Sequence, residues 1–107
     1  MAFRVEITDP AIDDIDEAIT FIAKGSRSAA AKSKASLEAV ILSLRDMPSR
    51  YPVIPEADEL EYPYRSAIHY SHRIIYRIDD EQSVVYVVRV YQGARHPLAK
   101  DEIDPSP

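Results

Sequence analysis

The chain contains no cysteine, which excludes a disulfide framework and a thiolate zinc site and is consistent with a reducing compartment. No apolar run approaches the ~20 residues that a membrane-spanning helix needs. The N-terminus, MAFRVEITDP, lacks the basic region and apolar core of an export signal. We therefore expect a cytoplasmic protein that is neither exported nor embedded in a membrane.

Lysine is absent between Lys34 and Lys100, and the formal net charge is −5. Neutralising phosphates requires clustered lysine and arginine, so this balance argues against non-specific nucleic-acid binding. The charges are nevertheless segregated. The segment Asp9–Glu17 carries five acids and no base, whereas Arg65–Arg95 carries five arginines and three acids. A local basic face therefore remains open.

Several catalytic and ligand-binding signatures are also missing. The chain has no glycine-rich phosphate loop, no serine in a nucleophile elbow, and no HxxxH or HExxH spacing among His69, His72 and His96. We therefore expect no metal and no cofactor, and hydrolase chemistry has little support.

What the sequence does contain is the pattern of a small α+β domain. With 107 residues the chain has room for one domain, which we place at residues 1–97, followed by a polar C-terminal tail at 98–107. Alternation predicts a strand at Phe3–Ile7, and the apolar stripes and breakers predict an antiparallel two-helix hairpin. Its first helix begins at Pro10 and ends at Gly25, and its second, capped by Ser26 or Ser28, runs over residues 29–47 and stops at Pro48. A loop at Ser49–Pro63 and a weaker strand at Tyr64–Tyr70 follow.

The stretch from Arg73 to Pro97 is the most informative. It holds two β-rich runs, Arg73–Ile78 and Val84–Tyr91, joined by DDEQS, which predicts a β-hairpin. An in-register pairing that makes the apolar faces coincide places Ile78 opposite Val84, Tyr76 opposite Tyr86, Ile74 opposite Val88, and Arg73 opposite Arg89. Opposed arginines repel, so we expect an anion or a partner's carboxylate between them. The alternative is a solvated outer face on a half-buried sheet.

Strand Tyr64–Tyr70 can face either way. A two-residue turn would place Arg65, Ala67 and His69 on the face of Ile74, and a bulge would reverse this. The cationic groups of the hairpin, with Tyr91 beside them, are the remaining candidates for chemistry: Arg73, Arg77, Arg89, Arg95 and His96. Cleavage of a phosphodiester by a ribose 2′-hydroxyl needs a base, a cation and an acid. His96, either Arg73 or Arg89, and Tyr91 offer these roles, although Tyr91 and His96 are equally suited to packing and turn formation.

The order of elements, with the motifs HRIIYRID and VVRVYQGARHP, resembles the RelE/ParE superfamily of toxins from type II toxin–antitoxin pairs, nearly to Pro97. In the second motif Gln92 stands where the family often has histidine. The resemblance implies a cytoplasmic toxin neutralised by an antitoxin that wraps around its helices and sheet. RelE-type members are ribosome-dependent mRNA endoribonucleases, which here implies Arg73, Arg89, Tyr91 and His96 as catalytic residues. ParE-type members inhibit DNA gyrase and lack that catalytic set.

The acidic balance and the missing lysines favour the ParE type, a non-enzymatic gyrase inhibitor with a ParD-type antitoxin. A non-toxic antitoxin-binding module of the same fold is a third possibility. We expect the target to be contacted by Arg89, Arg95 and His96, without direct sequence-specific nucleic-acid binding. The antitoxin should contact the helix stripes and three strand arginines: Ile12, Ile15, Ile19, Ile22, Leu37, Val40, Ile41, Leu44, Arg73, Arg77 and Arg89. Acids on the antitoxin would pair with those arginines.

Overall fold

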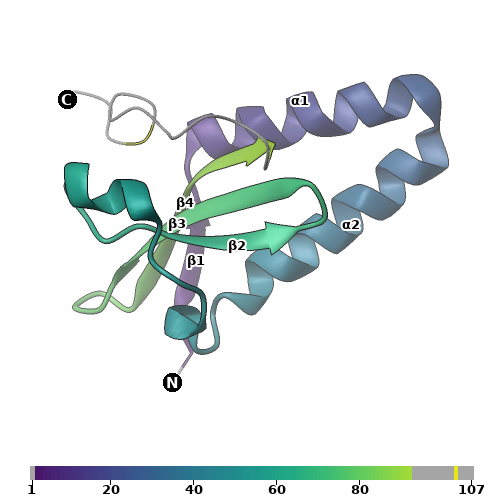
Figure 1. The fold of residues 1–107 in the computed structure, drawn as a ribbon. Coiled ribbons are helices and arrows are strands. Elements are labelled where there is room, and N and C mark those ends of the chain that lie inside the picture. The colour runs from purple at the N-terminus through teal and green to yellow at the C-terminus, as the bar shows by residue number, and fades with distance from the viewer. Residues whose placement is uncertain (1, 93–102, 104–107) are drawn as a thin grey trace.

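The computed structural model describes residues 2–92 and residue 103. A strand is followed by two helices, two short 3₁₀ turns and three further strands (Figure 1). These elements are β1 (Arg4–Ile7), α1 (Asp9–Gly25), α2 (Arg27–Ser43), η1 (Pro48–Arg50), η2 (Pro55–Glu59), β2 (Arg65–His69), β3 (His72–Asp79) and β4 (Val84–Gln92). The predicted α+β order is therefore confirmed.

The strands form one mixed sheet in the order β1-β4-β3-β2. Strand β1 runs parallel to β4, and the other neighbours are antiparallel. The two helices form an antiparallel hairpin over one face of this sheet, and the turn between them projects beyond the strands (Figure 1). No helix within the described residues is both long and apolar enough to cross a membrane.

The local signals place the helix boundaries with one exception. Pro10 lies in the first turn of α1, and the Ser26 hydroxyl caps α2 by accepting from the Ala29 N–H at 3.1 Å. The second helix ends at Ser43, earlier than the predicted Met47. After Ser43 the backbone N–H groups of Leu44, Arg45 and Asp46 bond to carbonyls three residues back, and Met47 takes a positive φ of 49°, so the α-helix does not continue.

The main core lies between the helix hairpin and the sheet. It combines Ala11 and Ile15 of α1 with residues of α2 and of three strands: Leu37, Ile41, Leu44, Ala67, Ile74, Tyr76, Val85, Val87 and Val90. The predicted helix stripes thus face inward for most of their length. Two isoleucines are exceptions: Ile22 is not part of this core, and Ile12 is 42% exposed. Ala11 and Ile15 take the inward positions of this helix turn instead.

The predicted register of the β3–β4 hairpin is wrong. Tyr76 lies opposite Val87 and Ile75 opposite Arg89, so Val88 is an extra residue that forms a β-bulge. The bulge brings Val90, rather than Val88, onto the helix-covered face. Correspondingly, Ile78 pairs with Val85, Ile74 with Val90, and Arg73 with Tyr91. The expected pair of opposed arginines does not form.

Strand β2 adopts the first of its two predicted orientations. Arg65 pairs with Tyr76, Ala67 with Ile74 and His69 with His72, so the two-residue turn consists of Tyr70 and Ser71. Tyr70 has a positive φ of 53°, which makes this tight turn possible. Because Ala67 and His69 point to the helix face, β2 contributes to the main core.

A second, smaller cluster covers the opposite face of the sheet, which we call the outer face. It consists of Ile54, Tyr64, Ile75, Tyr91 and Ile103. The predicted loop at Ser49–Pro63 supplies Ile54, and Ile103 comes from the segment we predicted to be a polar tail. Only 3% of the Ile103 surface is exposed, so the tail contributes at least this residue to the packed structure.

Candidate functional site

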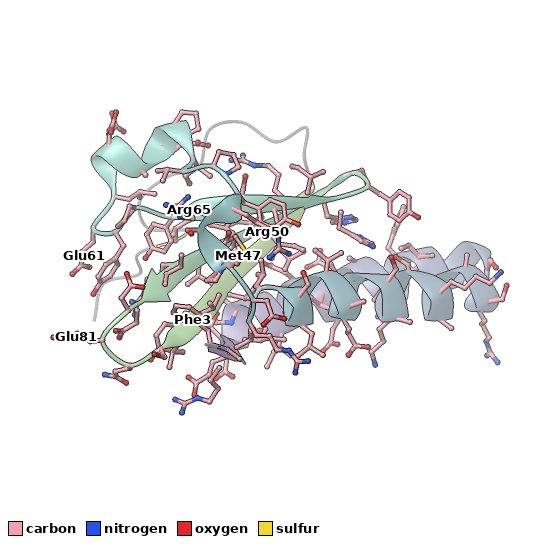
Figure 2. All side chains as sticks on the ribbon, turned by 90° about the horizontal axis from the view of Figure 1, so that it is seen from below. Phe3, Met47, Arg50, Glu61, Arg65 and Glu81 are labelled. Atoms are coloured by element: carbon pink, nitrogen blue, oxygen red, sulfur yellow. The ribbon has the colours of Figure 1, made fainter. Side chains whose placement is uncertain are left out.

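The four arginines of the last three strands are all engaged by groups of the chain itself. Arg65 donates to the carbonyls of Ser49 at 3.1 Å and Tyr51 at 2.5 Å, and it lies near Arg50 (Figure 2). Arg77 lies between two tyrosine rings, 4.2 Å from the centroid of Tyr62 and 4.4 Å from that of Tyr86. These are distances at which a guanidinium is attracted to an aromatic face.

The Arg89 guanidinium makes a two-pronged ion pair with Asp14 of α1. Its Nε lies 2.8 Å from Asp14 Oδ2, and its Nη2 lies 2.9 Å from Oδ1. The same Oδ2 accepts the backbone N–H of Val90 at 2.9 Å. One carboxylate therefore joins helix α1 to both the side chain and the backbone of β4. Both side chains are largely shielded, with 23% of Arg89 and 13% of Asp14 exposed.

Arg73 pairs with Glu56 of η2, with 3.5 Å between Nη1 and Oε2. Both side chains are mostly buried. The carboxylates that we expected from a partner are thus supplied by the chain itself, from α1 to Arg89 and from η2 to Arg73. In the observed register Arg73 lies opposite Tyr91 and Arg89 opposite Ile75, so the two arginines are separated along the strands and pair with different acids.

Three of the four residues proposed for a ribonuclease gather at the end of β4. Arg73 lies opposite Tyr91, and the Arg89 guanidinium lies 4.5 Å from the Tyr91 ring centroid. However, the Tyr91 side chain is only 4% exposed and belongs to the outer cluster. The fourth candidate, His96, lies outside the described residues. The same is true of Arg95, which is a predicted target contact.

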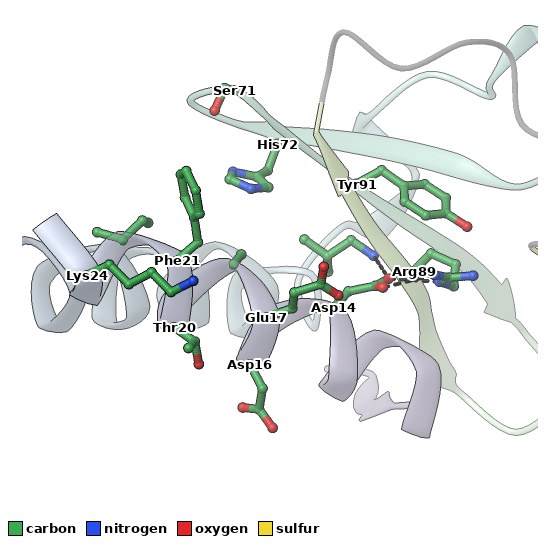
Figure 3. Close-up of a pocket in the computed structure, with 13 residues that line it drawn as sticks. Asp14, Asp16, Glu17, Thr20, Phe21, Lys24, Ser71, His72, Arg89 and Tyr91 are labelled. Carbon is green, nitrogen blue, oxygen red and sulfur yellow. Dashed lines mark hydrogen bonds and ion pairs between the residues drawn. The ribbon is translucent and has the colours of Figure 1, made fainter.

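A cleft opens beside the ion pair between Asp14 and Arg89. One wall is the C-terminal part of α1, from Asp14 to Lys24. The other wall is formed by the β2–β3 turn and the end of β4 (Figure 3). The cleft has a volume of about 880 Å³. Its lining residues are Asp14, Asp16, Glu17, Ala18, Thr20, Phe21, Ile22, Lys24, Ser71, His72, Arg89, Val90 and Tyr91. We refer to it as the α1 cleft.

The wall that β4 contributes to the α1 cleft is an incompletely paired strand edge. Strand β1 pairs with β4 only from Val84 to Val87. Beyond that point Thr8 Oγ1 donates to the Val88 carbonyl at 3.2 Å, and Asp14 accepts the Val90 N–H. No described strand continues β1 along Val90 and its successors. Because N–H and C=O of one strand residue point the same way, the Val90 carbonyl also lies on this edge.

The predicted antitoxin-binding residues fall into two groups. Ile15, Leu37, Ile41 and Leu44 are buried in the main core, and Ile19 and Val40 pack against it, so these side chains of the two stripes face the sheet. Ile12 is exposed, and Ile22 lines the α1 cleft. The exposed Phe21, which sequence reasoning missed, lies off the isoleucine stripe. Its only signal was an aromatic residue on the polar side of an amphipathic helix.

Two histidines flank the turn between β2 and β3. His69 is 6% exposed, and its Nε2 lies 2.8 Å from the Ser36 hydroxyl of α2. Burial, with the nearby His72, lowers the pKa of His69 below its ordinary value. Within the described residues, no group of three or more histidine, aspartate or glutamate side chains is arranged to hold a metal ion.

The comparisons with known proteins agree with this architecture. A family model described as the ParE toxin of the type II toxin–antitoxin system parDE matches residues 5–97. A comparison with curated proteins gave no match.

Several solved structures share the fold, including the three that follow. A chain in the RelBE2 toxin–antitoxin complex from Mycobacterium tuberculosis is 24% identical, with a TM-score of 0.61 over 86% of this chain and 99% of that one. A chain of the chromosomal ParDE system from P. aeruginosa is 11% identical, with a TM-score of 0.64 over 85% of this chain and 96% of that one. The E. coli RelE toxin in the free state, with two arginines replaced by alanine, is 16% identical, with a TM-score of 0.61 over 88% of this chain and 86% of that one.

Proposed function

The chain belongs to the ParE family of toxins from type II toxin–antitoxin systems, and from this premise we propose that it inhibits DNA gyrase and is neutralised by a ParD-type antitoxin in the cytoplasm. In this proposal the chain acts by binding a protein and performs no chemistry of its own. The similar chains from the RelBE2 toxin–antitoxin complex and the ParDE toxin–antitoxin system support a cognate antitoxin as partner.

The observation that carries the choice of target is the engagement of the arginines. A ribonuclease needs cations that are available to a phosphate and to the charge that develops during cleavage. Here Arg73 and Arg89 are held by Glu56 and Asp14, and Arg77 is held between two tyrosine rings. Opening either ion pair would leave a mostly shielded carboxylate without its cation, which is costly. The net charge of −5 opposes RNA binding as well.

The test is a supercoiling assay with purified gyrase and the purified chain, freed of any co-purifying partner. We expect loss of supercoiling or trapped cleaved DNA, relieved by a ParD-type antitoxin. The predicted target contacts are tested by Arg95→Ala and His96→Ala, with Arg4→Ala as a matched control because the exposed Arg4 pairs only with Glu6 among the described residues. A folded sample that leaves gyrase fully active would refute the proposal.

One observation favours the RelE-type ribonuclease as a second candidate. Arg73, Arg89 and Tyr91 come together at one end of the sheet, as that reading requires. It predicts that His96→Ala and Arg89→Ala abolish ribosome-dependent mRNA cleavage while circular dichroism shows an intact fold. Cleavage that persists in both variants would exclude it. Growth that is unchanged on expression without an antitoxin would instead identify a non-toxic antitoxin-binding module.

The predicted antitoxin surface also takes a different form. Partner acids were expected to pair with Arg73, Arg77 and Arg89, but these three side chains already have partners within the chain. The C-terminal part of α1, by contrast, presents accessible groups beside the α1 cleft, among them Phe21, which is 73% exposed. We therefore propose the α1 cleft as part of the antitoxin-binding surface.

A further inference from the structure

The α1 cleft carries an ordered pattern of charge along its helical wall. Asp14, Glu17, Phe21 and Lys24 all line the cleft and follow one another at spacings of three, four and three residues, which places them on one stripe of the helix. Asp14 is neutralised by Arg89. Towards the C-terminal end of α1, the rest of this stripe therefore presents an anion (Glu17), an aromatic ring (Phe21) and a cation (Lys24).

The groups of this stripe are available to a partner. The exposed fraction of Phe21 is 73%, and its ring points towards the cleft beside His72 (Figure 3). Glu17 and Lys24 are both exposed and make no ion pair with any described residue. Asp16 also lines the cleft, but it lies on the outer side of the helix in the same view (Figure 3). These exposed groups lie beside an incompletely paired strand edge, which offers backbone groups to an extended partner segment.

We propose that the α1 cleft binds an extended segment of the antitoxin with a basic residue, an apolar residue and an acidic residue at alternate positions. This inference rests on the proposed function and adds the chemistry of the partner segment. The basic residue pairs with Glu17, the apolar residue packs on Phe21, and the acidic residue pairs with Lys24. The order is given from the N-terminus of a segment that runs in the same direction as α1, because a segment running the opposite way would carry the three residues in the reverse order.

The spacing follows from the geometry of the two backbones. At 1.5 Å per residue, Phe21 and Lys24 lie ~6 Å and ~10 Å along the helix from Glu17. In an extended segment, residues two and four positions apart are separated by ~7 Å and ~13 Å and point to the same side. The long, flexible lysine side chain covers the remaining ~3 Å. An extended conformation also suits the other wall, where the Val90 carbonyl lies on the edge of β4 and can accept a backbone N–H.

The experiment uses three synthetic peptides with blocked ends, binding to the full chain and followed by NMR titration. The first is Thr-Val-Lys-Thr-Leu-Thr-Glu-Val-Thr. The second carries glutamate in place of its lysine, and the third carries lysine in place of its glutamate. We expect the first peptide to bind the unmodified chain about threefold more tightly than either control, which is the size of one exposed ion pair. The resonances of Phe21 and Val90 should shift.

Charge reversal in the chain should change the order of affinity. Glu17→Lys should bind the doubly acidic peptide best, and Lys24→Glu should bind the doubly basic peptide best. Glu38→Lys, a reversal of an exposed acid on α2 that does not line the cleft, should leave the order unchanged. Phe21→Ser should weaken all three peptides alike, and ~0.5 M salt should remove the discrimination because it screens exposed charges.

An order of affinity that stays the same in Glu17→Lys and Lys24→Glu would overturn the inference, as would the absence of binding by all three peptides at millimolar concentration. The gyrase assay separates this failure from that of the proposed function. Inhibition of gyrase without peptide discrimination refutes only the assigned segment chemistry. Peptide discrimination without inhibition of gyrase supports the cleft and refutes the target.

Discussion

Replacing Asp14 by alanine should destabilise the protein far more than replacing an acid in an exposed ion pair. The substitution removes two hydrogen bonds to Arg89, at 2.8 and 2.9 Å, and one to the Val90 N–H at 2.9 Å. Hydrogen bonds to charged groups contribute about 1.5–3 kcal/mol each, and breaking a buried ion pair costs about 3–5 kcal/mol. Water can reach the released Arg89 in part, since 23% of its side chain is exposed, which lowers the cost.

We therefore expect Asp14→Ala to lower the free energy of unfolding by about 2–3 kcal/mol, which corresponds to a fall in Tm of about 10 °C or more for a domain of this size. Circular dichroism during thermal and urea unfolding measures both quantities. Glu6→Ala is the matched control, because Glu6 also pairs with an arginine but with 46% of its side chain exposed, and it should change Tm little. A double-mutant cycle with Arg89→Ala isolates the pair. Equal effects of Asp14→Ala and Glu6→Ala would refute this reasoning.

Three further predictions concern the core and its titratable groups. Burial lowers the pKa of His69 in the folded state, so the unfolded chain takes up a proton more readily as the pH falls below 6.5. The free energy of unfolding, measured by urea titration, should therefore fall below this pH, and His69→Gln should make it depend less on pH. Burial raises the pKa of Tyr76 from 10.0 to about 12, so stability should fall as the pH rises above 10, and Tyr76→Phe should reduce this loss. At neutral pH the same variant should be less stable by about 1–3 kcal/mol, because the buried Tyr76 hydroxyl donates to the Pro48 carbonyl. Ile74→Ala, at a position with no exposed surface, should cost about 2–5 kcal/mol in the same assay, and a loss below about 1 kcal/mol would contradict the described packing.

The fold could be predicted from the sequence because its determinants are local. Alternation defines β1, Pro10 and Gly25 delimit α1, and Ser26 caps α2. These signals depend on a few neighbouring residues and on the period of apolar positions, which a single sequence displays. The resemblance in the strands beginning at His72 and Val84 then identified the superfamily, and the family match over residues 5–97 agrees with it.

The register of β3 and β4 could not be predicted in the same way. Both runs are so rich in β-branched and aromatic residues that either face of β4 has an apolar pattern, and nothing in the sequence marks Val88 as the bulged residue. Packing selects the register, because Val85, Val87 and Val90 must all meet the helices. A shift of one residue moves every following side chain to the other face.

The sequence by itself determined the composition of the candidate site, and the tertiary structure decided its chemistry. Arginines on the strands and acids on the first helix are visible in the sequence as two separate blocks of charge. Only the fold brings Asp14 to Arg89 and Glu56 to Arg73, across 75 residues in the first case. An ion pair between distant segments depends on where two elements cross, and that crossing is set by the packing of the whole core rather than by any local pattern. The apparent cationic face is consequently neutralised within the chain, and the available charges, Glu17 and Lys24, lie on the helix beside the cleft.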